Sequence, residues 1–144
     1  MKFRDADEFR TCFEQIFRLM NDHPEVGRPL RDLDAPNRFE ISDLDLVFNV
    51  AAAPQTDEAD GRLLRWMWGD EGRDWEPLIS LKMASDVANR FFQGKENVAL
   101  AVAMGRVKLR GPLSKILEMA PITKPIHGVY RTWLTDQGYD HLLA

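Results

Sequence analysis

The fold of this chain is decided by residues 77–117, which read PLISLKMASDVANRFFQGKENVALAVAMGRVKLRGPLSKIL. Hydrophobic and polar side chains alternate over residues 79–83 and again over 106–110, as expected of strands with one buried face. The residues between them are rich in hydrophobic side chains at helical spacing. The stretch therefore predicts two half-buried strands joined by apolar helices, and it contains no catalytic motif.

Capping residues and prolines predict where the helices of this stretch begin and end. Ser85 or Asp86 is expected to cap the first helix, and Gly94 to end it. Pro112 stops the second strand and starts a further helix, because proline suits a first helical turn. Pro121 is expected to break that helix, since proline lacks the backbone N–H that a helix interior uses.

The N-terminal segment predicts an amphipathic helix that opens at Asp5 or Asp7 and ends at His23. Spacings of three and four place its apolar residues on one broad face: Phe9, Cys12, Phe13, Ile16, Phe17, Leu19 and Met20. Core packing is the simpler interpretation of this face. A lid or wall over a cavity is the alternative that the pattern leaves open.

Three further strands are expected between the N-terminal helix and the opening stretch. Alternating patterns place them at residues 38–42, 44–50 and 63–69, with polar turns at 51–61 and 69–76. Helical spacing returns near the C-terminus. Because strands come first and helices later, the sequence predicts an α+β fold with all 144 residues, 1–144, in one domain.

Charge is divided unevenly along the chain. Residues 1–79 hold 10 Lys and Arg against 18 Asp and Glu, a net charge of −8, whereas residues 80–144 hold 9 against 5, a net charge of +4. Two solvated surfaces of opposite sign would explain this, and so would a basic surface for acidic headgroups or coenzyme phosphates. A nucleic-acid partner is not predicted, because the total charge is −4 and basic and aromatic residues do not interleave.

Cysteine content and hydropathy predict a cytoplasmic protein. Cys12 is the only cysteine in the sequence, which excludes an intramolecular disulfide and a cysteine-rich zinc site. The acidic start has no apolar signal-peptide segment. The longest strongly apolar run, residues 98–104, is too short to cross a bilayer.

Catalytic patterns are missing from the sequence. The three histidines, His23, His127 and His141, show no metal-ligand spacing. The sequence has neither a G-x-S-x-G elbow nor a Walker loop. Acidic pairs such as Asp43 and Asp45 are interpreted as turn residues. The sequence therefore predicts no catalytic residue, no metal and no cofactor, and a protein that is not an enzyme.

Large, adaptable apolar side chains are the chemical signal that remains, with six Met, eight Phe and four Trp among the 144 residues. Flexible methionines and flat aromatic rings suit a cavity that accepts varied apolar shapes. They suit a dense core equally well, and composition leaves both interpretations open.

The opening stretch resembles the sterol carrier protein type-2 family. The resemblance rests on a helix ending at Gly94-Lys95, the following Asn97, an apolar segment leading into Gly105-Arg106, and the strand VKLRG followed by a helix. The segments FEISDLDLVFNV and LLRWMWG upstream fit the family's order, so the resemblance covers roughly residues 36–120. Arg106 stands where the family more commonly has lysine, and the peroxisomal ending of animal members is missing.

The resemblance implies a five-stranded, mostly antiparallel sheet covered on one face by helices that enclose an apolar tunnel. Family members bind and move sterols, fatty acids, fatty acyl-CoA or isoprenoid and quinone-type lipids without covalent change. Eleven residues are expected to line the tunnel: Phe48, Trp66, Trp68, Leu81, Met83, Phe91, Val102, Met104, Ile116, Met119 and Trp133. Residues 122–133 are the expected lid. Four cationic residues are expected to meet an anionic membrane or acyl-CoA at its mouth: Arg106, Lys108, Arg110 and Lys124.

Two other hypotheses follow from the same fold. One is an interaction module that forms a homodimer or scaffolds lipid-metabolising enzymes through exposed aromatic surface. The other is a cofactor-free enzyme, such as an isomerase, which would need a titratable residue inside the tunnel.

Overall fold

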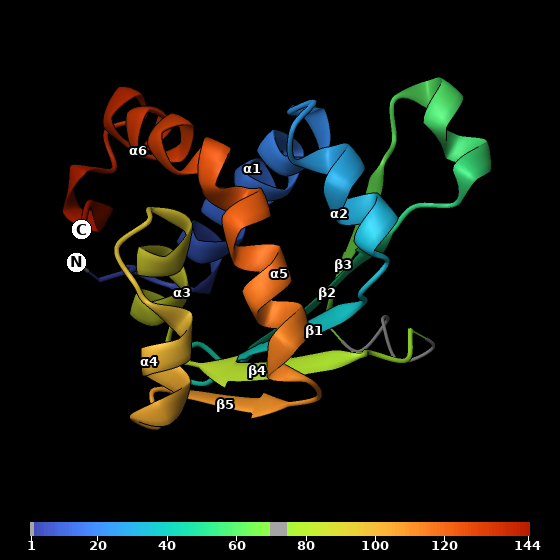
Figure 1. Cartoon of the computed structure of the whole chain (residues 1–144). Helices are drawn as coiled ribbons and strands as arrows, with labels where there is room; N and C mark the ends of the chain where they lie inside the picture. Colours follow the sequence, from blue (N-terminus) through green and yellow to red (C-terminus); the bar gives the residue numbers. More distant parts are fainter. Residues whose placement is uncertain (1, 70–74) are drawn as a thin grey trace.

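A five-stranded sheet covered on one face by helices forms the architecture of the chain (Figure 1). The computed structural model describes residues 2–69 and 75–144. The strands are β1 (Asn37–Ile41), β2 (Leu46–Ala52), β3 (Leu64–Trp68), β4 (Ile79–Met83) and β5 (Val107–Arg110). Their order across the sheet is β3-β2-β1-β4-β5, with β1 and β4 parallel and the other neighbours antiparallel. The predicted α+β class and mostly antiparallel sheet are confirmed.

Helices cover the upper face of the sheet in Figure 1, and α4 packs beside β5 and α5. The α-helices are α1 (Ala6–Asp22), α2 (Gly27–Leu33), α3 (Ser85–Phe92), α4 (Val98–Ala103), α5 (Leu113–Thr123) and α6 (His127–Asp136). Short 3₁₀ helices are η1 (Gln55–Asp60), η3 (Lys124–Ile126) and η4 (Asp140–Leu142). The two ends of the chain lie close together, and Nε2 of His141 is 2.9 Å from Oε1 of Glu8.

Strand register decides which side chains face the helices. Phe39 of β1 lies opposite Phe48 of β2 and Leu81 of β4, and all three are buried under the helices. Because side chains alternate along a strand, the neighbouring positions point to the other face. There Lys82 of β4 lies opposite Lys108 of β5, and both are exposed.

The amphipathic pattern of α1 is confirmed. Asp5 caps the helix by accepting a hydrogen bond of 2.8 Å from the backbone N–H of Glu8. Six residues of the predicted apolar face are buried: Phe9, Cys12, Phe13, Ile16, Phe17 and Met20. Burial raises the pKa of the Cys12 thiol to about 12 and the Glu8 charge adds to this, while a hydrogen bond with Tyr130 opposes it. Cys12 is therefore a core residue and not a reactive thiol.

The predicted start of α3 is wrong. Neither Ser85 nor Asp86 is its N-cap, since the helix begins at Ser85 and its cap position is Ala84. The carboxylate of Asp43, from the turn between β1 and β2, accepts hydrogen bonds from the backbone N–H of Ser85 (2.8 Å) and from its hydroxyl (2.6 Å). A capping partner 42 residues away in the sequence replaces the local one. Gly94, with φ of 74°, follows the end of the helix as predicted.

Two other boundaries differ from the sequence prediction. Pro121 lies inside α5, which runs on to Thr123. The helix tolerates it near its C-terminal end, where only the last turns are affected. The expected polar turn at 51–61 is shorter, because β2 extends to Ala52 and Gln55–Asp60 forms η1. The turn expected at 69–76 includes residues 70–74, which lie outside the described residues.

Candidate functional site

An apolar cavity lies between the inner face of the sheet and helices α1, α2, α3 and α5. About 950 Å³ of space lies among its walls and at its mouth, of which about 70 Å³ is wide enough for the centre of a water-sized sphere. Its main apolar walls are Phe17, Met20, Leu30, Leu33, Phe39, Phe48, Val50, Leu81, Met83, Val87, Ala88, Phe91, Phe92, Val98, Val107, Ile116, Met119 and Ala120. The cavity is therefore a narrow slot that side-chain movement would widen.

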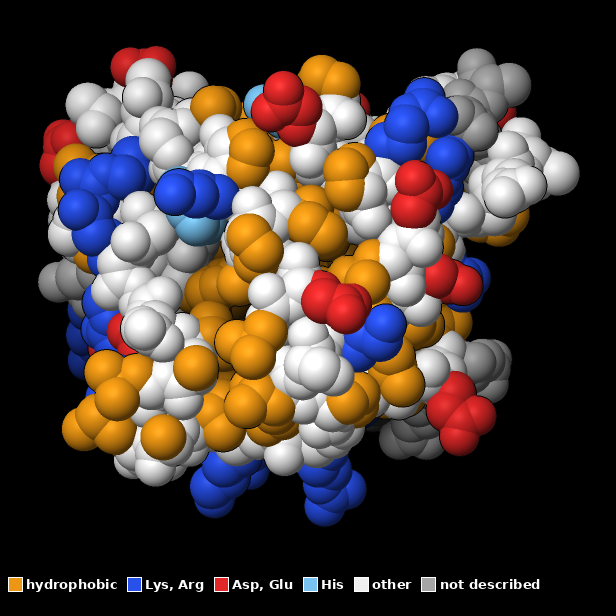
Figure 2. Space-filling model, in the orientation of Figure 1, with side chains coloured by type: hydrophobic (Ala, Val, Ile, Leu, Met, Phe, Trp, Pro, Cys, Tyr) orange, Lys and Arg blue, Asp and Glu red, His pale blue; other side chains and the backbone are white. Residues whose placement is uncertain are grey.

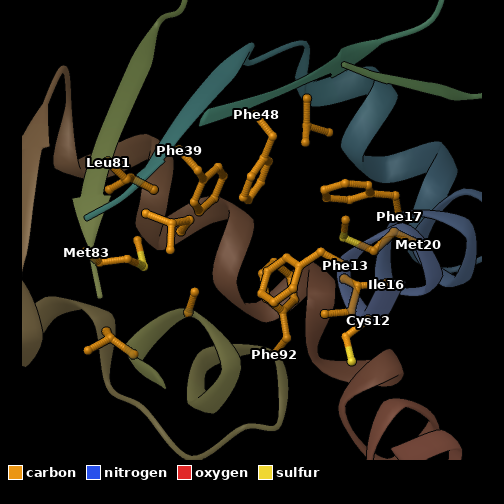
Figure 3. Packing of buried hydrophobic residues seen from close by; sticks show 14 of the residues in the cluster. Cys12, Phe13, Ile16, Phe17, Met20, Phe39, Phe48, Leu81, Met83 and Phe92 are labelled. Carbon is orange, nitrogen blue, oxygen red and sulfur yellow. The ribbon is translucent and has the colours of Figure 1, made fainter. Parts of the chain in front are cut away.

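Aromatic rings from the sheet and helices form one end of this slot (Figure 3). The rings of Phe39 and Phe48 stack with their centroids 4.7 Å apart, because β1 and β2 pair in this register. Phe13 and Phe92 meet edge to face at 5.6 Å below them. Stacked and edge-to-face rings at these distances are favourable aromatic pairs, so they hold this part of the wall together.

Among the described residues that line the cavity, Glu96 is the one that carries a charge. Its carboxylate accepts hydrogen bonds from Nη2 of Arg106 at 2.8 Å and from Nε of Arg90 at 3.0 Å, and its side chain is 6% exposed. Nη1 of Arg90 also pairs with Asp86 at 2.8 Å. Burial alone would raise the pKa of Glu96, but the hydrogen bonds and charges of the two arginines outweigh it and lower the pKa. The carboxylate is therefore ionised near neutral pH.

A second hollow, here called the vestibule, opens beside the cavity. It is lined by Phe91, Gly94, Glu96, Asn97, Val98, Ala99, Leu117, Ala120, Lys124 and His127. About 290 Å³ of it is wide enough for the centre of a water-sized sphere. Four of its residues, Phe91, Glu96, Val98 and Ala120, also line the cavity. The vestibule therefore lies directly beside the cavity, with residues of α3 and α4 on one side and of α5 and α6 on the other.

His127 and Lys124 form the polar side of the vestibule. Burial lowers the pKa of His127, and the nearby Lys124 charge lowers it further. The Nε2 atom of His127 is buried and has no hydrogen-bond partner among the described residues. A neutral histidine and a lysine together give the vestibule a site where a polar or anionic group would find hydrogen-bond donors.

Six of the eleven predicted wall residues do line the cavity: Phe48, Leu81, Met83, Phe91, Ile116 and Met119. They come from the sheet and from helices α3 and α5. Whether they contact a ligand remains a prediction.

The other five lie elsewhere: Trp66, Trp68, Val102, Met104 and Trp133. Trp66 and Trp68 face α1 from the edge strand β3, and their ring N–H groups donate to the two carboxylate oxygens of Glu14 at 3.0 and 2.6 Å. Trp133 stacks on Tyr130 within the C-terminal helices. Val102 and Met104 belong to α4 and its C-terminal end. None of these five residues lines the cavity, although Trp66 and Trp68 pack against the wall residues Phe17 and Phe48.

The four cationic residues expected at the mouth are also divided. Lys124 lines the vestibule, and Arg106 lies beside it, bound to Glu96. Lys108 and Arg110 are exposed on the outer face of the sheet, opposite Lys82 and Ser80 of β4. Strand alternation causes this separation, because Val107 and Leu109 take the inner positions of β5.

Sequence reasoning missed Glu96 and the contribution of α2. The position of Phe39 was available from its alternation in β1, in register with Phe48. Glu96 carries no local signal, because its arginine partners are brought together only by the folded chain.

Among the described residues no group of acidic, histidine or cysteine side chains is arranged to hold a metal ion. None of the described helices is long and apolar enough to cross a membrane.

Comparison with solved structures finds several proteins of the same shape. The sterol carrier protein 2 of Yarrowia lipolytica, in its apo form, superposes with a TM-score of 0.57 and 17% identity over 78% of this chain and 86% of that one. The sterol carrier protein domain 2 of Helicoverpa armigera superposes with a TM-score of 0.56 and 11% identity, over 89% of this chain and 94% of that one. The ubiquinone synthesis protein UbiJ-SCP2 superposes with a TM-score of 0.58 and 8% identity, over 81% of this chain and 92% of that one.

Part of a larger enzyme is similar as well. The sec-alkylsulfatase Pisa1 from Pseudomonas sp. matches with a TM-score of 0.52 and 15% identity over 67% of this chain, which spans only 14% of that enzyme. No family model matches the sequence, and no curated protein matches it either. The similarity is therefore one of architecture: this chain has the sterol carrier protein 2 fold.

Proposed function

We propose that this protein binds an apolar lipid in the cavity between sheet and helices and transfers or presents it without chemical change. The observation that carries the proposal is the cavity itself, which has apolar walls from strands and helices and an approach through the vestibule. Most concave sites of this composition hold small, largely apolar molecules. Proteins named as sterol carriers share the fold, which supports the same class of ligand here.

The shape of the cavity favours a flexible chain over a rigid ring system. Only about 70 Å³ of the cavity admits the centre of a water-sized sphere before any side chain moves. A fatty acyl or isoprenoid chain can occupy a slot by small rotations of Met83, Met119 and the phenylalanines, because methionine adapts its shape easily. A fused-ring sterol would demand a larger displacement of closely packed walls. We therefore infer an acyl or isoprenoid chain as the ligand.

Burial of apolar surface would supply the affinity. Removing about 300 Å² of lipid from water contributes about 7 kcal/mol at about 25 cal/mol per Å². Loss of translational freedom and ordering of the chain offset part of this. The ~7 kcal/mol alone would give a dissociation constant of about 7 μM, so the balance corresponds to about 10 μM or weaker.

Glu96 argues against acid–base chemistry in the cavity. It is a carboxylate on the wall, which is what a cofactor-free enzyme would need. Its pKa is lowered because Arg106 and Arg90 hold the ionised form, and a general base needs a pKa near the working pH. The arrangement favours a structural ion pair and a protein that carries its ligand unchanged.

Fluorescence titration tests the proposal, because two tryptophans contact the cavity wall. The ring centroids of Trp66 and Phe17 lie 5.5 Å apart, and those of Trp68 and Phe48 lie 5.2 Å apart. We expect a saturable change in emission with fatty acids, and affinity that rises with chain length until the chain fills the slot. A sterol and a quinone analogue serve as comparisons. No saturable change with any of these ligands would contradict the proposal.

A further inference from the structure

Large apolar side chains are exposed together on α4 and α5, the two helices at the front of Figure 2. The exposed fractions are 51% for Leu100, 64% for Met104, 38% for Leu113 and 51% for Leu117. We call these four residues the apolar rim. The hydrophobic atoms gather over this part of the surface in the space-filling view. Exposed apolar patches of this kind usually mark a binding surface.

The apolar rim is continuous with the approach to the cavity. Leu117 belongs to the rim and also lines the vestibule. Ala120, three positions further along α5, lines both the vestibule and the cavity. On the other side, α4 begins at Val98, which also lines both hollows. Whatever covers the rim therefore also covers the entrance.

Positive charge surrounds the rim. Lys95 and Lys124 are exposed and have no carboxylate partner within the described parts of the chain, and Lys124 lines the vestibule. Nη1 of Arg106 lies 3.3 Å from the sulfur of Met104. The nearby carboxylates are neutralised, since Glu96 pairs with two arginines and Glu118 pairs with Lys115 at 3.3 Å. The region thus combines exposed apolar side chains with unpaired lysines.

We propose that the apolar rim docks on the surface of a lipid bilayer that contains anionic headgroups and holds the vestibule against the acyl chains. This inference rests on the proposed function, because it assigns the route by which a lipid would reach the cavity. Leu100, Met104 and Leu117 enter the interfacial layer while Lys95 and Lys124 meet the headgroups. A lipid moving from the bilayer through the vestibule then avoids exposing its chain to water.

A bilayer fits this surface better than a second copy of the chain. A twofold dimer places the same patch on both partners, which would bring Lys95 and Lys124 of each copy toward those of the other. Like charges close together at an interface are unfavourable. An anionic bilayer instead offers a carboxylate or phosphate for each lysine, and an apolar layer directly beneath.

Vesicle flotation tests the inference. The wild-type protein is mixed with vesicles of phosphatidylcholine alone, and with vesicles of phosphatidylcholine and phosphatidylglycerol. We expect binding to the second kind that weakens with added salt. The double variant Leu100→Ser/Leu117→Ser should reduce this binding by roughly tenfold or more, because two exposed leucines no longer enter the interface. The control Val129→Ser, at an apolar residue of α6 that is 44% exposed, should leave binding unchanged.

A matched pair of lysine variants tests the orientation. Lys124→Ala should weaken binding to the anionic vesicles, whereas Lys108→Ala, on the outer face of the sheet, should not. The inference is overturned if the protein binds neither kind of vesicle, or if the rim variants bind as the wild type does. It is also overturned if light scattering shows a dimer that Leu100→Ser/Leu117→Ser converts to a monomer.

A soluble ligand separates this inference from the proposed function. Titration with decanoate below its micelle concentration needs the cavity and not a bilayer. The single variant Leu100→Ser, at a rim residue that lines neither hollow, supports the docking surface if it binds decanoate normally but binds anionic vesicles more weakly. A wild-type protein that binds decanoate but no vesicle overturns the docking surface alone, and one that binds no decanoate overturns the proposed function.

Discussion

Nη2 of Arg106 lies 2.8 Å from Oε1 of Glu96, at the junction of the apolar cavity and the vestibule. This contact joins the segment between α3 and α4 to the start of β5. Because Glu96 is also bound to Arg90 of α3, the carboxylate holds the edge of the sheet and the helical layer together beside the entrance. A charged group on an apolar wall is thereby kept from binding water.

Replacing this carboxylate should destabilise the fold. Glu96→Gln removes the charge while keeping the shape, and leaves two arginines without their partner. We expect the free energy of unfolding to fall by about 1.5–3 kcal/mol, the range for hydrogen bonds to charged groups. Urea denaturation measures the change. Glu118→Gln, whose side chain is 52% exposed, is the control and should change stability by less than about 0.5 kcal/mol. Equal effects in the two variants would show that the junction has no special role.

Gly94 and His127 should be coupled in stability. Both Gly94 and Gly105 have positive φ, 74° and 80°, so alanine at either should cost about 1–2 kcal/mol. A Cβ at Gly94 would lie 2.8 Å from Nδ1 of His127, whereas one at Gly105 meets nothing within 4 Å. We therefore expect Gly94→Ala to be the more destabilising of the two. Adding His127→Ala to Gly94→Ala should restore the extra loss in the free energy of unfolding. Adding it to Gly105→Ala should restore nothing. If His127→Ala restores no stability to Gly94→Ala, the contact between position 94 and His127 is contradicted.

His127 should make stability depend on pH. Its pKa in the folded protein lies below the ordinary value of 6.5, because of burial and the Lys124 charge. As pH falls through about 6.5, the unfolded chain takes up a proton before the folded one, so the free energy of unfolding decreases toward the folded pKa. The difference in the free energy of unfolding by which the wild type exceeds His127→Gln should therefore shrink as the pH is lowered from about 7.5 to about 5.5. Urea midpoints at both pH values measure it, and a constant difference would contradict the buried setting of His127.

Tyr130 should be essential for the packing of the C-terminal helices. Its buried hydroxyl donates to Oδ1 of Asn89 at 2.7 Å, while the amide of Asn89 donates to the carbonyl of Leu142 at 2.9 Å. Tyr130→Phe leaves a buried acceptor unpaired and should cost about 1–3 kcal/mol. Tyr139→Phe is the control, since the Tyr139 hydroxyl makes no hydrogen bond with the described residues. Thermal unfolding of the two variants compares them, and equal melting temperatures would contradict the role of the Asn89 network.

Periodicity predicted the layers of this fold well because burial on one face leaves a local pattern. The alternation at residues 79–83 and 106–110 placed β4 and β5, and spacings of three and four placed the buried face of α1. The same patterns predicted inner and outer faces, and the resemblance to the sterol carrier family assigned Phe48, Leu81 and Met83 to the cavity wall, which they line.

Features that depend on distant partners were not predictable in this way. Asp43 lies in a turn as predicted, but its carboxylate also binds the start of α3 at Ser85, 42 residues further along the chain. Trp66 and Trp68 have the right periodicity for a wall, but β3 is the edge strand and they pack on α1 beside Glu14. Met104 lies at the end of an apolar run yet is largely exposed, because α4 sits outside the helical layer.

The central claim is that the cavity holds a lipid chain, and native mass spectrometry tests it most directly. The protein is incubated with a mixture of fatty acids of different chain length, and the same is done with Ala120→Phe and with Ala103→Phe. Ala120 lines both the cavity and the vestibule, so a phenylalanine there should close the passage, whereas Ala103 is exposed on α4 and lines neither. The account predicts one bound fatty acid per wild-type and Ala103→Phe chain and none on Ala120→Phe, with circular dichroism confirming that all three are folded. Absence of bound lipid on the wild type, or equal binding to all three proteins, would contradict it.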